Sequence, residues 1–294
     1  MQGPSLSIPK ISSFQDFPLS KENRMKCVFT LAGSDVRYAE MVKVLVVSAK
    51  YVSNLELYCL YDGDDESLVQ WLSKSGVVVL PWRVSFAADM VGRYRGTKSI
   101  QFCLGTYLCT DIPIALRYYG ISDEFVLYVD VDTVFLGDID LGGCRPKYFA
   151  APPDWDIGDW SFVSVGVMLL NTQTLLDSHP AFMQHLRNHA YDFDFAGHGG
   201  ADQGAWNTFY HGLWDNLGPE YDWKPWWGFN PKAHIVHFSG PKPRDVRAIL
   251  IDPVERPNDP LSRKINFFVI KQNPDAYRRY LHIWEKYHRM IECQ

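Results

Sequence analysis

Phe125–Asp132 reads FVLYVDVD, an uninterrupted apolar run that ends in two aspartates. A run without alternation is typical of a strand buried on both faces, as in a sheet that helices cover on both sides. Asp130 and Asp132 follow at the carboxyl end of this strand, where open α/β sheets bind their ligands. The stretch therefore predicts an α/β fold with a ligand site at the end of a buried strand.

The residues before this stretch predict strands that alternate with helices. Strands are expected at Cys27–Ala32, Leu55–Tyr61 and Val77–Leu80. Helices are expected after Asp35, a good N-cap, and over Asp65–Lys74. Alternation of this kind predicts a parallel sheet covered by helices.

After the buried strand the pattern changes to short strands among many Trp, Pro and Gly residues. Strands are expected at Val163–Asn171 and Ile235–Phe238, and a helix at Asp202–Phe209. A last helix is expected to begin at Pro274, with Asn273 as its N-cap.

Composition limits the classes of protein to which the chain can belong. Its 294 residues are 47% hydrophobic and 15% aromatic, which is enough apolar surface to offset the entropy lost on folding. A net charge of -5 argues against binding along nucleic acid, whereas a single diphosphate needs only a local cationic pocket. We therefore expect no nucleic-acid partner.

The start of the chain and its cysteines bear on location. Met1–Ser20 lacks both a basic start and an apolar run, and no segment approaches the length needed to cross a bilayer. The 6 cysteines include no Cys-x-x-Cys pair, so we expect reduced thiols, mostly in the core. A cytoplasmic protein is the expectation.

The two aspartates suit a divalent metal. Asp130 and Asp132, spaced two apart, can direct hard oxygen ligands to one side, where Mg²⁺ or Mn²⁺ would keep positions for phosphate oxygens. Alone, this pair fits loop-capping carboxylates equally well. His237 offers a nitrogen ligand that favours Mn²⁺, Gly240 lets backbone approach a phosphate, and Lys242 adds a positive charge. Together these residues predict a metal–diphosphate site.

The sequence resembles the family 8 retaining glycosyltransferases, the group that includes glycogenin and the lipooligosaccharide galactosyltransferases. The resemblance covers Met25–Arg244, and several motifs occur in family order. They are Phe29-Thr30-Leu31 with Tyr38 downstream, Tyr128–Asp132, Gly166–Asn171 (GVMLLN), Asp202–Asn207 (DQGAWN) and His237–Pro243.

This resemblance implies a GT-A fold, with a Rossmann-like nucleotide-binding half, a mixed central sheet and a fused acceptor-side half. We expect residues 1–24 to form an irregular arm and residues 25–294 to form one domain. The halves are placed at residues 25–135 and 136–270, followed by a C-terminal helix over residues 271–294.

The resemblance also implies a UDP-sugar donor, a hexose as the transferred group and a carbohydrate acceptor. Asp130, Asp132 and His237 are similar to the family's metal ligands, for Mn²⁺ or Mg²⁺, and Gly240 and Lys242 would hold the diphosphate. Asp202 and Gln203 are similar to the pair beneath the donor sugar and are the catalytic candidates. The remaining donor contacts expected are Leu31, Ala32, Asp35, Tyr38, Lys98, Val131 and Ser164.

The chemistry agrees with this assignment. Breaking the bond to UDP develops charge on a diphosphate, which a divalent metal and Lys242 stabilise without proton transfer. In retaining hydrolases a carboxylate attacks the sugar from the opposite face. Asp202 or Gln203 would serve that face here, and front-side attack by the acceptor fits the sequence equally well.

Three departures from the family pattern leave the donor sugar open. Cys109 stands where a donor-contacting Arg is usual, and Lys98 is the candidate cation that compensates. Ser164 stands where an Asn is frequent. The loop from His237 to Lys242 is one residue shorter than in many members, and Arg244 replaces a frequent Trp.

Further partners and rival functions follow from other residues. Trp226 and Trp227 are candidates for an exposed acceptor shelf. The basic, aromatic C-terminal helix could make weak peripheral contact with an anionic membrane, or pack with a solvated face. A catalytically silent nucleotide-sugar binder is one alternative. Another is a haloacid-dehalogenase-type phosphatase, which would need Thr where Val134 stands.

Overall fold

The computed structural model describes residues 24–95, 100–141, 143–189, 195, 201–251 and 260–291. The expected N-terminal arm, apart from Arg24, and the candidate Lys98 lie outside this part of the chain. The strands of the described residues are β1 (Lys26–Ala32), β2 (Glu56–Asp62), β3 (Val78–Pro81), β4 (Phe125–Val129), β5 (Thr133–Phe135), β6 (Phe149–Ala151), β7 (Val167–Asn171), β8 (Asp215–Asn216) and β9 (Ile235–His237).

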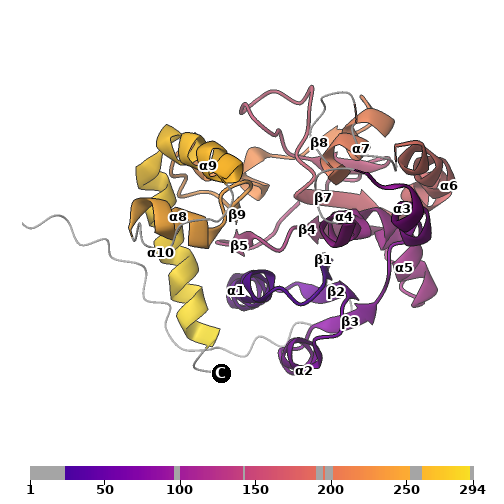
Figure 1. The fold of residues 1–294 in the computed structure, drawn as a ribbon, viewed down its shortest axis with the longest axis horizontal. Helices are drawn as coiled ribbons and strands as arrows, with labels where there is room; N and C mark the ends of the chain where they lie inside the picture. The colour runs from indigo at the N-terminus through magenta and orange to yellow at the C-terminus, as the bar shows by residue number, and fades with distance from the viewer. Residues whose placement is uncertain are drawn as a thin grey trace, which may run out of the picture.

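Helices surround these strands (Figure 1). The α-helices are α1 (Val36–Val52), α2 (Glu66–Lys74), α3 (Ala87–Arg93), α4 (Ile100–Thr106), α5 (Ile112–Tyr118), α6 (Thr172–Asn188), α7 (Ala201–Phe209), α8 (Pro243–Leu250), α9 (Pro260–Gln272) and α10 (Pro274–Ile291). The 3₁₀ turns are η2 (Tyr107–Asp111), η3 (Pro219–Tyr221) and η4 (Pro225–Trp227).

The central sheet has seven strands in the order β3-β2-β1-β4-β7-β6-β8. Strands β3, β2, β1 and β4 run parallel, and β7 is antiparallel to both β4 and β6. The sheet is therefore mixed, and the predicted α/β class is confirmed. The apolar run that became β4 lies in the middle of the sheet, which is why it carries no polar face.

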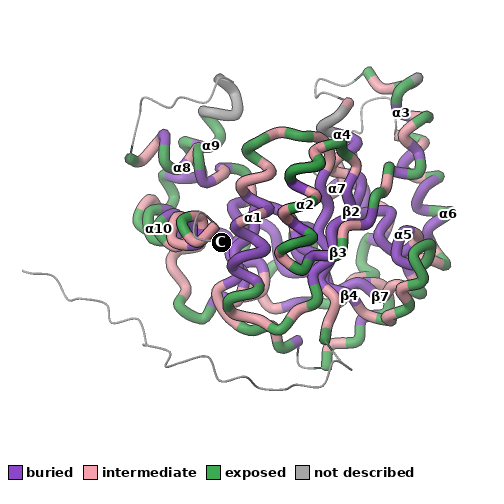
Figure 2. Tube along the Cα trace, turned by 90° about the horizontal axis from the view of Figure 1, so that it is seen from below, coloured by how far each residue is buried: buried purple, intermediate pink, exposed green. Residues whose placement is uncertain are grey.

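Alternate residues of the strands fill two separate cores. Val28 and Tyr58 pack with α4 to α7 on one face, while Cys27 and Phe29 pack with α1 and α2 on the other. This alternation follows from the two-residue period of a strand. Figure 2 shows the strands buried between the layers and exposed residues on the outer side of α2.

Helix α1 also has a second buried side. Val44 and Val47 pack with α10 and with the two-stranded sheet of β5 and β9 in a third core. The buried hydroxyl of Ser48 accepts a 3.1 Å hydrogen bond from the backbone N–H of Phe135 and so ties β5 to α1. The small sheet is thereby held against the parallel half of the central sheet.

A buried carboxylate joins the parallel half to α6. Asp111, which is fully buried, accepts hydrogen bonds from Trp82 Nε1 (3.0 Å), the backbone N–H of Ser85 (2.5 Å) and its hydroxyl (3.1 Å). Nε2 of His179 lies 3.0 Å from the same carboxylate. Four polar atoms thus meet one side chain where solvent does not reach.

Most expected elements lie at or within a residue or two of their predicted bounds, and β4 coincides with its own. The strand expected at Val163–Asn171 is shorter, because β7 begins at Val167. Val163 forms only an isolated bridge with Pro153, and Asn273 caps α10 as expected, with Oδ1 accepting from the N–H of Ala276 at 3.4 Å.

Two further expectations can be compared with the described residues. Cys27, Cys59 and Cys109 are buried thiols, as predicted, and Cys144 is half-buried. Across the described ranges no helix has both the length and the apolar character that crossing a membrane requires.

Candidate functional site

The site is built where β4 ends and β5 begins. The backbone N–H of Asp130 donates to Gly166 O at 2.7 Å, which closes the sheet against the segment before β7. The chain turns at once into β5, and β5 pairs with β9 so that Thr133 lies opposite His237. This pairing brings Asp132 beside a histidine that is distant in sequence.

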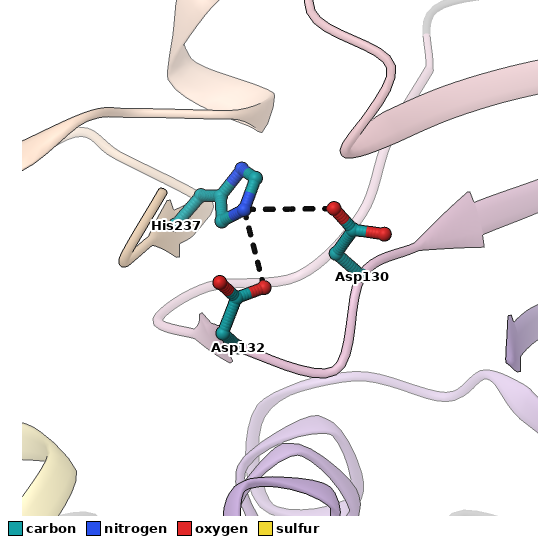
Figure 3. Close-up of side chains that lie close together, drawn as sticks. All are labelled: Asp130, Asp132 and His237. Atoms are coloured by element: carbon teal, nitrogen blue, oxygen red, sulfur yellow. Dashed lines mark ion pairs between the residues drawn. The ribbon is translucent and has the colours of Figure 1, made fainter. Parts of the chain in front are cut away.

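Three side chains converge there, as the close-up shows (Figure 3). Nε2 of His237 lies 3.2 Å from Oδ1 of Asp132 and 3.7 Å from Oδ2 of Asp130. One ligand atom from each of the three residues lies within 4.8 Å of the other two. Two carboxylates and one imidazole are ligands suited to Mn²⁺, so the residues fit the predicted metal.

Burial and charge set the protonation of this cluster. Burial raises the pKa of Asp130 to about 6, and the neighbouring charge of Asp132 adds to the effect. Burial also works to raise the pKa of Asp132, but Lys242 and His237 outweigh it and hold that pKa well below its usual range. Burial works to lower the pKa of His237, yet the carboxylates of Asp132 and Asp222 raise it to about 10. A proton on His237 thus supplies positive charge between the carboxylates.

Two fully buried charges behind His237 were not foreseen from the sequence. Nδ1 of His237 lies 2.9 Å from Oδ1 of Asp222, whose other oxygen pairs with Lys224. Lys224 also donates to Pro153 O at 3.3 Å. With Nδ1 held by Asp222, Nε2 is the nitrogen that faces the two metal-side aspartates, as in many carboxylate–histidine–metal units.

Gly166 makes room for the histidine. A Cβ at this position would overlap Cε1 of His237, and it would stand 2.6 Å from Nδ1 of the ring and 3.1 Å from Oδ2 of Asp130. The backbone of Gly166 has no positive φ that demands glycine. The requirement at this position is therefore space, which the side chains of the metal cluster occupy.

Lys242 approaches the cluster from the loop after β9. Its ammonium group pairs with Asp132 and donates to Phe238 O at 3.4 Å. Gly240, earlier in this loop, has a φ of 78° and open space where a side chain would be. The sequence placed both residues at the diphosphate, and the structure brings Lys242 to the metal cluster and leaves the backbone of Gly240 accessible.

Residues expected around the uridine lie on β1 and at the start of α1. Leu31 is buried, and Asp35 caps α1 by accepting from the N–H of Arg37 at 2.8 Å, with an ion pair to the same arginine. Burial raises the pKa of Tyr38; the charge of Lys242 works to lower this pKa, and that of Asp132 works to raise it. Ala32 is half-buried, and Val131 is buried beside the aspartates.

A pocket lies between α1 and the loop that leads into α8. Arg37, Tyr38, Lys242 and Arg244 are among the residues that line it, together with Trp284 of α10. The pocket joins the expected uridine side of the site to the expected diphosphate side. Arg244, which replaces the family's frequent Trp, is held there by an ion pair with Glu40 (2.7 Å).

The catalytic candidates lie at the start of α7. Oδ2 of Asp202 accepts a weak hydrogen bond from the thiol of Cys109 at 3.5 Å. Burial raises the pKa of Asp202 to about 7, and the charge of Asp130 adds to this. Asp202 is thus close enough to the metal cluster for the two carboxylates to influence each other. Cys109, where an Arg was usual, packs a neutral thiol against that carboxyl.

Gln203 and Ser164 are placed differently from Asp202. Nε2 of Gln203 donates to Oδ2 of Asp154 at 2.9 Å, and Asp154 is buried at the base of the loop after β6. Ser164 is also buried, and its hydroxyl accepts from the N–H of Gly166 at 3.5 Å. Asp154 was missed by the sequence analysis, and no motif marks it.

The mixed sheet, with an Asp-Val-Asp turn after its central strand, has the α/β architecture of the GT-A glycosyltransferases. An active-site mutant of LgtC superposes with a TM-score of 0.55 at 15% identity, covering 75% of this chain and 89% of that one. The glycosyltransferase GlyE of Streptococcus pneumoniae TIGR4 gives 0.53 at 18% identity, covering 75% of this chain and 56% of GlyE. The bifunctional glycosyltransferase WbbM gives 0.54 at 14% identity, covering 88% and 53%.

At identities this low the likeness concerns the fold. No protein-family model matches the sequence, and no curated protein matches it. The chain spans little more than half the length of GlyE and WbbM.

Proposed function

We propose that this chain is a metal-dependent retaining glycosyltransferase of the family 8 type, which transfers a hexose from a UDP-sugar to a carbohydrate acceptor. The observation that carries the proposal is the meeting of Asp130, Asp132, His237 and Lys242 at the end of β4 in a GT-A fold. Carboxylates, an imidazole and a cation in one place suit the metal and diphosphate of such a donor.

Each residue of the site has a role in this proposal. Asp130, Asp132 and His237 would hold Mn²⁺ or Mg²⁺, which supplies positive charge to a departing diphosphate. Lys242 would exchange its contact with Asp132 for a phosphate oxygen and add a second positive charge there. Asp35 and Tyr38 would contact the uridine, beside the pocket that ends at Lys242.

Asp202 and Gln203 would lie beneath the donor sugar. Asp202 offers a carboxyl whose pKa burial has raised to about 7, and Gln203 offers an amide oriented by Asp154. A nucleophilic role requires a free carboxylate or amide oxygen aimed at the sugar. In front-side attack by the acceptor, the same residues would only stabilise charge. The proposed function includes both this mechanism and the one with a nucleophilic residue.

The experiment that tests the function is a donor panel. UDP-glucose, UDP-galactose, UDP-N-acetylglucosamine and UDP-xylose are each incubated with the full chain and Mn²⁺, and UDP release is measured. We expect release from one donor, abolished by EDTA and by Asp132→Asn. Asp177→Asn is the matched control, because this carboxylate is exposed on α6 and contacts only Gln173 among the described hydrogen-bond partners.

The donor panel and a phosphatase assay together separate the alternatives. Tight UDP binding without release from any donor would favour the catalytically silent binder, for which the neutral Cys109 beside Asp202 is the supporting observation. Release of phosphate from generic phosphoesters, lost in Asp130→Asn, would favour the phosphatase. That alternative needs a hydroxyl at position 134, where Val134 is buried in β5.

Membrane contact through α10 stays a prediction. Two of its basic side chains are already engaged in the protein: Arg278 pairs with Asp275 (2.8 Å), and Arg279 lies over the ring of Phe229 (3.4 Å to the centroid). Sedimentation with vesicles containing anionic lipid would test whether the helix binds them.

A further inference from the structure

The loop after β6 presents an exposed indole ring. Trp155 is 61% exposed, while every other tryptophan of the chain is buried or half-buried. Single exposed apolar side chains are common in folded proteins, so what marks Trp155 is the support beneath its ring and the place of its loop. Trp226 and Trp227, which the sequence suggested as the exposed shelf, lie half-buried behind it.

The ring has a rigid support. It packs on Trp226 with ring centroids 5.4 Å apart and planes tilted by 32°. Nε1 of Trp227 donates to Trp155 O at 2.6 Å, and the buried ammonium of Lys224 lies 5.2 Å from the Trp227 ring. Both the ring and the backbone of Trp155 therefore have contacts in the unliganded protein, and such support reduces the entropy lost on binding.

The base of this loop is tied to the proposed reaction centre. Asp154, the residue before Trp155, accepts from Gln203 at 2.9 Å, and Gln203 is one of the two residues expected beneath the donor sugar. The carbonyl of Pro153, the residue before Asp154, accepts a hydrogen bond from Lys224. Lys224 pairs with Asp222, which in turn contacts His237. Trp155 thus follows directly on two residues that contact the supports of the proposed site.

We propose that Trp155, supported by Trp226, is a stacking platform for a pyranose ring of the carbohydrate acceptor. The inference rests on the proposed function and specifies the ligand chemistry of its acceptor side. The flat indole suits the apolar C–H face of a sugar ring. It would bind that ring where Gln203 and Asp154 meet the loop.

Charge on the loop selects among occupants of the platform. Residues 155–159 are all exposed and read WDIGD, with Asp156 and Asp159 and no Lys or Arg. Negative charge repels an anionic lipid surface or a nucleic-acid backbone, whereas carboxylates accept hydrogen bonds from sugar hydroxyls. A neutral pyranoside is the occupant that matches both the ring and the charge.

Saturation-transfer NMR on the full chain tests the proposal. The methyl glycosides of glucose, galactose and N-acetylglucosamine are titrated in the presence of UDP and Mg²⁺, because paramagnetic Mn²⁺ would broaden the glycoside signals. We expect one of them to receive saturation on the protons of one ring face, and Trp155→Ala to raise its Kd about tenfold, the size of one aromatic contact. Trp155→Phe should retain most of the binding, because it keeps a flat ring.

Tyr118→Ala is the matched control. Tyr118 is 74% exposed at the end of α5, and its ring packs on Trp82 and Tyr119, so we expect glycoside binding to stay as in the wild type. The affinity for UDP and Mn²⁺, measured by calorimetry, should be the same in Trp155→Ala as in the wild type. That result separates loss of a platform from a damaged fold.

Two failures have different meanings. If wild-type protein does not bind UDP with Mn²⁺, the proposed function itself is wrong. If UDP binds but no glycoside does, or if Trp155→Ala binds the glycoside as tightly as wild type, the platform is refuted and the donor site stands.

Discussion

Replacing Gly166 by alanine would press one methyl group into the metal cluster. The added Cβ would overlap Cε1 of His237 and stand 2.6 Å from its Nδ1, which is too close for any real contact. The ring cannot swing away cheaply, because it is 4% exposed and Nδ1 is bonded to Asp222 at 2.9 Å. Either His237 leaves its place or the segment before β7 moves away from Asp130.

The cost has two parts. Overpacking of a well-filled site costs about 1–3 kcal/mol. For 294 residues, about 2.1 cal/mol/K each gives an unfolding entropy of about 0.6 kcal/mol/K, so the melting temperature should fall by about 2–5 °C. Displacement of His237 should weaken Mn²⁺ binding by about 10–100-fold, the range seen when support of a metal-bound histidine is lost.

Thermal unfolding and calorimetric titration with Mn²⁺ measure the two parts separately. Gly137→Ala is the control, because its Cβ would lie 3.2 Å from the ring of His234, a half-buried histidine outside the cluster. We expect this control to keep the wild-type Mn²⁺ affinity. Unchanged Mn²⁺ affinity in Gly166→Ala, with the fold intact, would refute the placement of His237 as the third ligand.

Three further predictions concern buried charges. Because the pKa of His237 is raised to about 10, its protonated form stabilises the metal-free fold fully below about pH 6.5, and this contribution is lost as the pH rises through 10. Binding of Mn²⁺ requires the neutral imidazole and should therefore release about one proton near pH 7.5. Calorimetry in buffers of different ionisation enthalpy measures this proton release. Asp222→Asn should destabilise the fold by about 3–5 kcal/mol by leaving Lys224 buried without a counter-charge, and adding Lys224→Met should restore the melting temperature but not the Mn²⁺ affinity. Asp111→Asn should cost about 1–3 kcal/mol in urea unfolding with Mn²⁺ affinity unchanged, since an amide N–H would then face hydrogen-bond donors.

Sequence predicted those parts of the fold in which local pattern and tertiary environment agree. Phe125–Val129 became β4 because an apolar run fits only a strand buried on both faces. Asp130 and His237 are grouped by residue type and by the motif resemblance, and the pairing of β5 with β9 is what brings them together. The strand expected from Val163 was wrong at its start, because β7 begins only at Val167. Gly166 packs against the metal cluster, and its N–H donates to the Ser164 hydroxyl.

The supporting residues of the site could not be found in this way. Asp222 and Lys224 stand in a tract rich in Trp and Pro, and charged residues are normally exposed, so nothing local indicates that both are fully buried. Trp155 is one of ten tryptophans in the sequence, and nothing local marks it as exposed. Its position depends on the hydrogen bond from Trp227 to Trp155 O and on the bond from Gln203 to the neighbouring Asp154. Such positions are set by contacts between segments far apart in sequence.

The pairing of β5 with β9 also bears on the order in which the molecule assembles. Asp132 and Lys242 are 110 residues apart in sequence, yet they meet in the same cluster. Contacts of such long range close late in folding, because a long loop must be ordered before they form. A chain still emerging from the ribosome, or one truncated before residue 237, would therefore lack a metal site even with its parallel strands in place. Under the proposed function, Mn²⁺ and a nucleotide diphosphate would bridge the end of β4 and the segment from β9 to α8 in the complete chain, so that donor binding would raise the stability of the whole molecule.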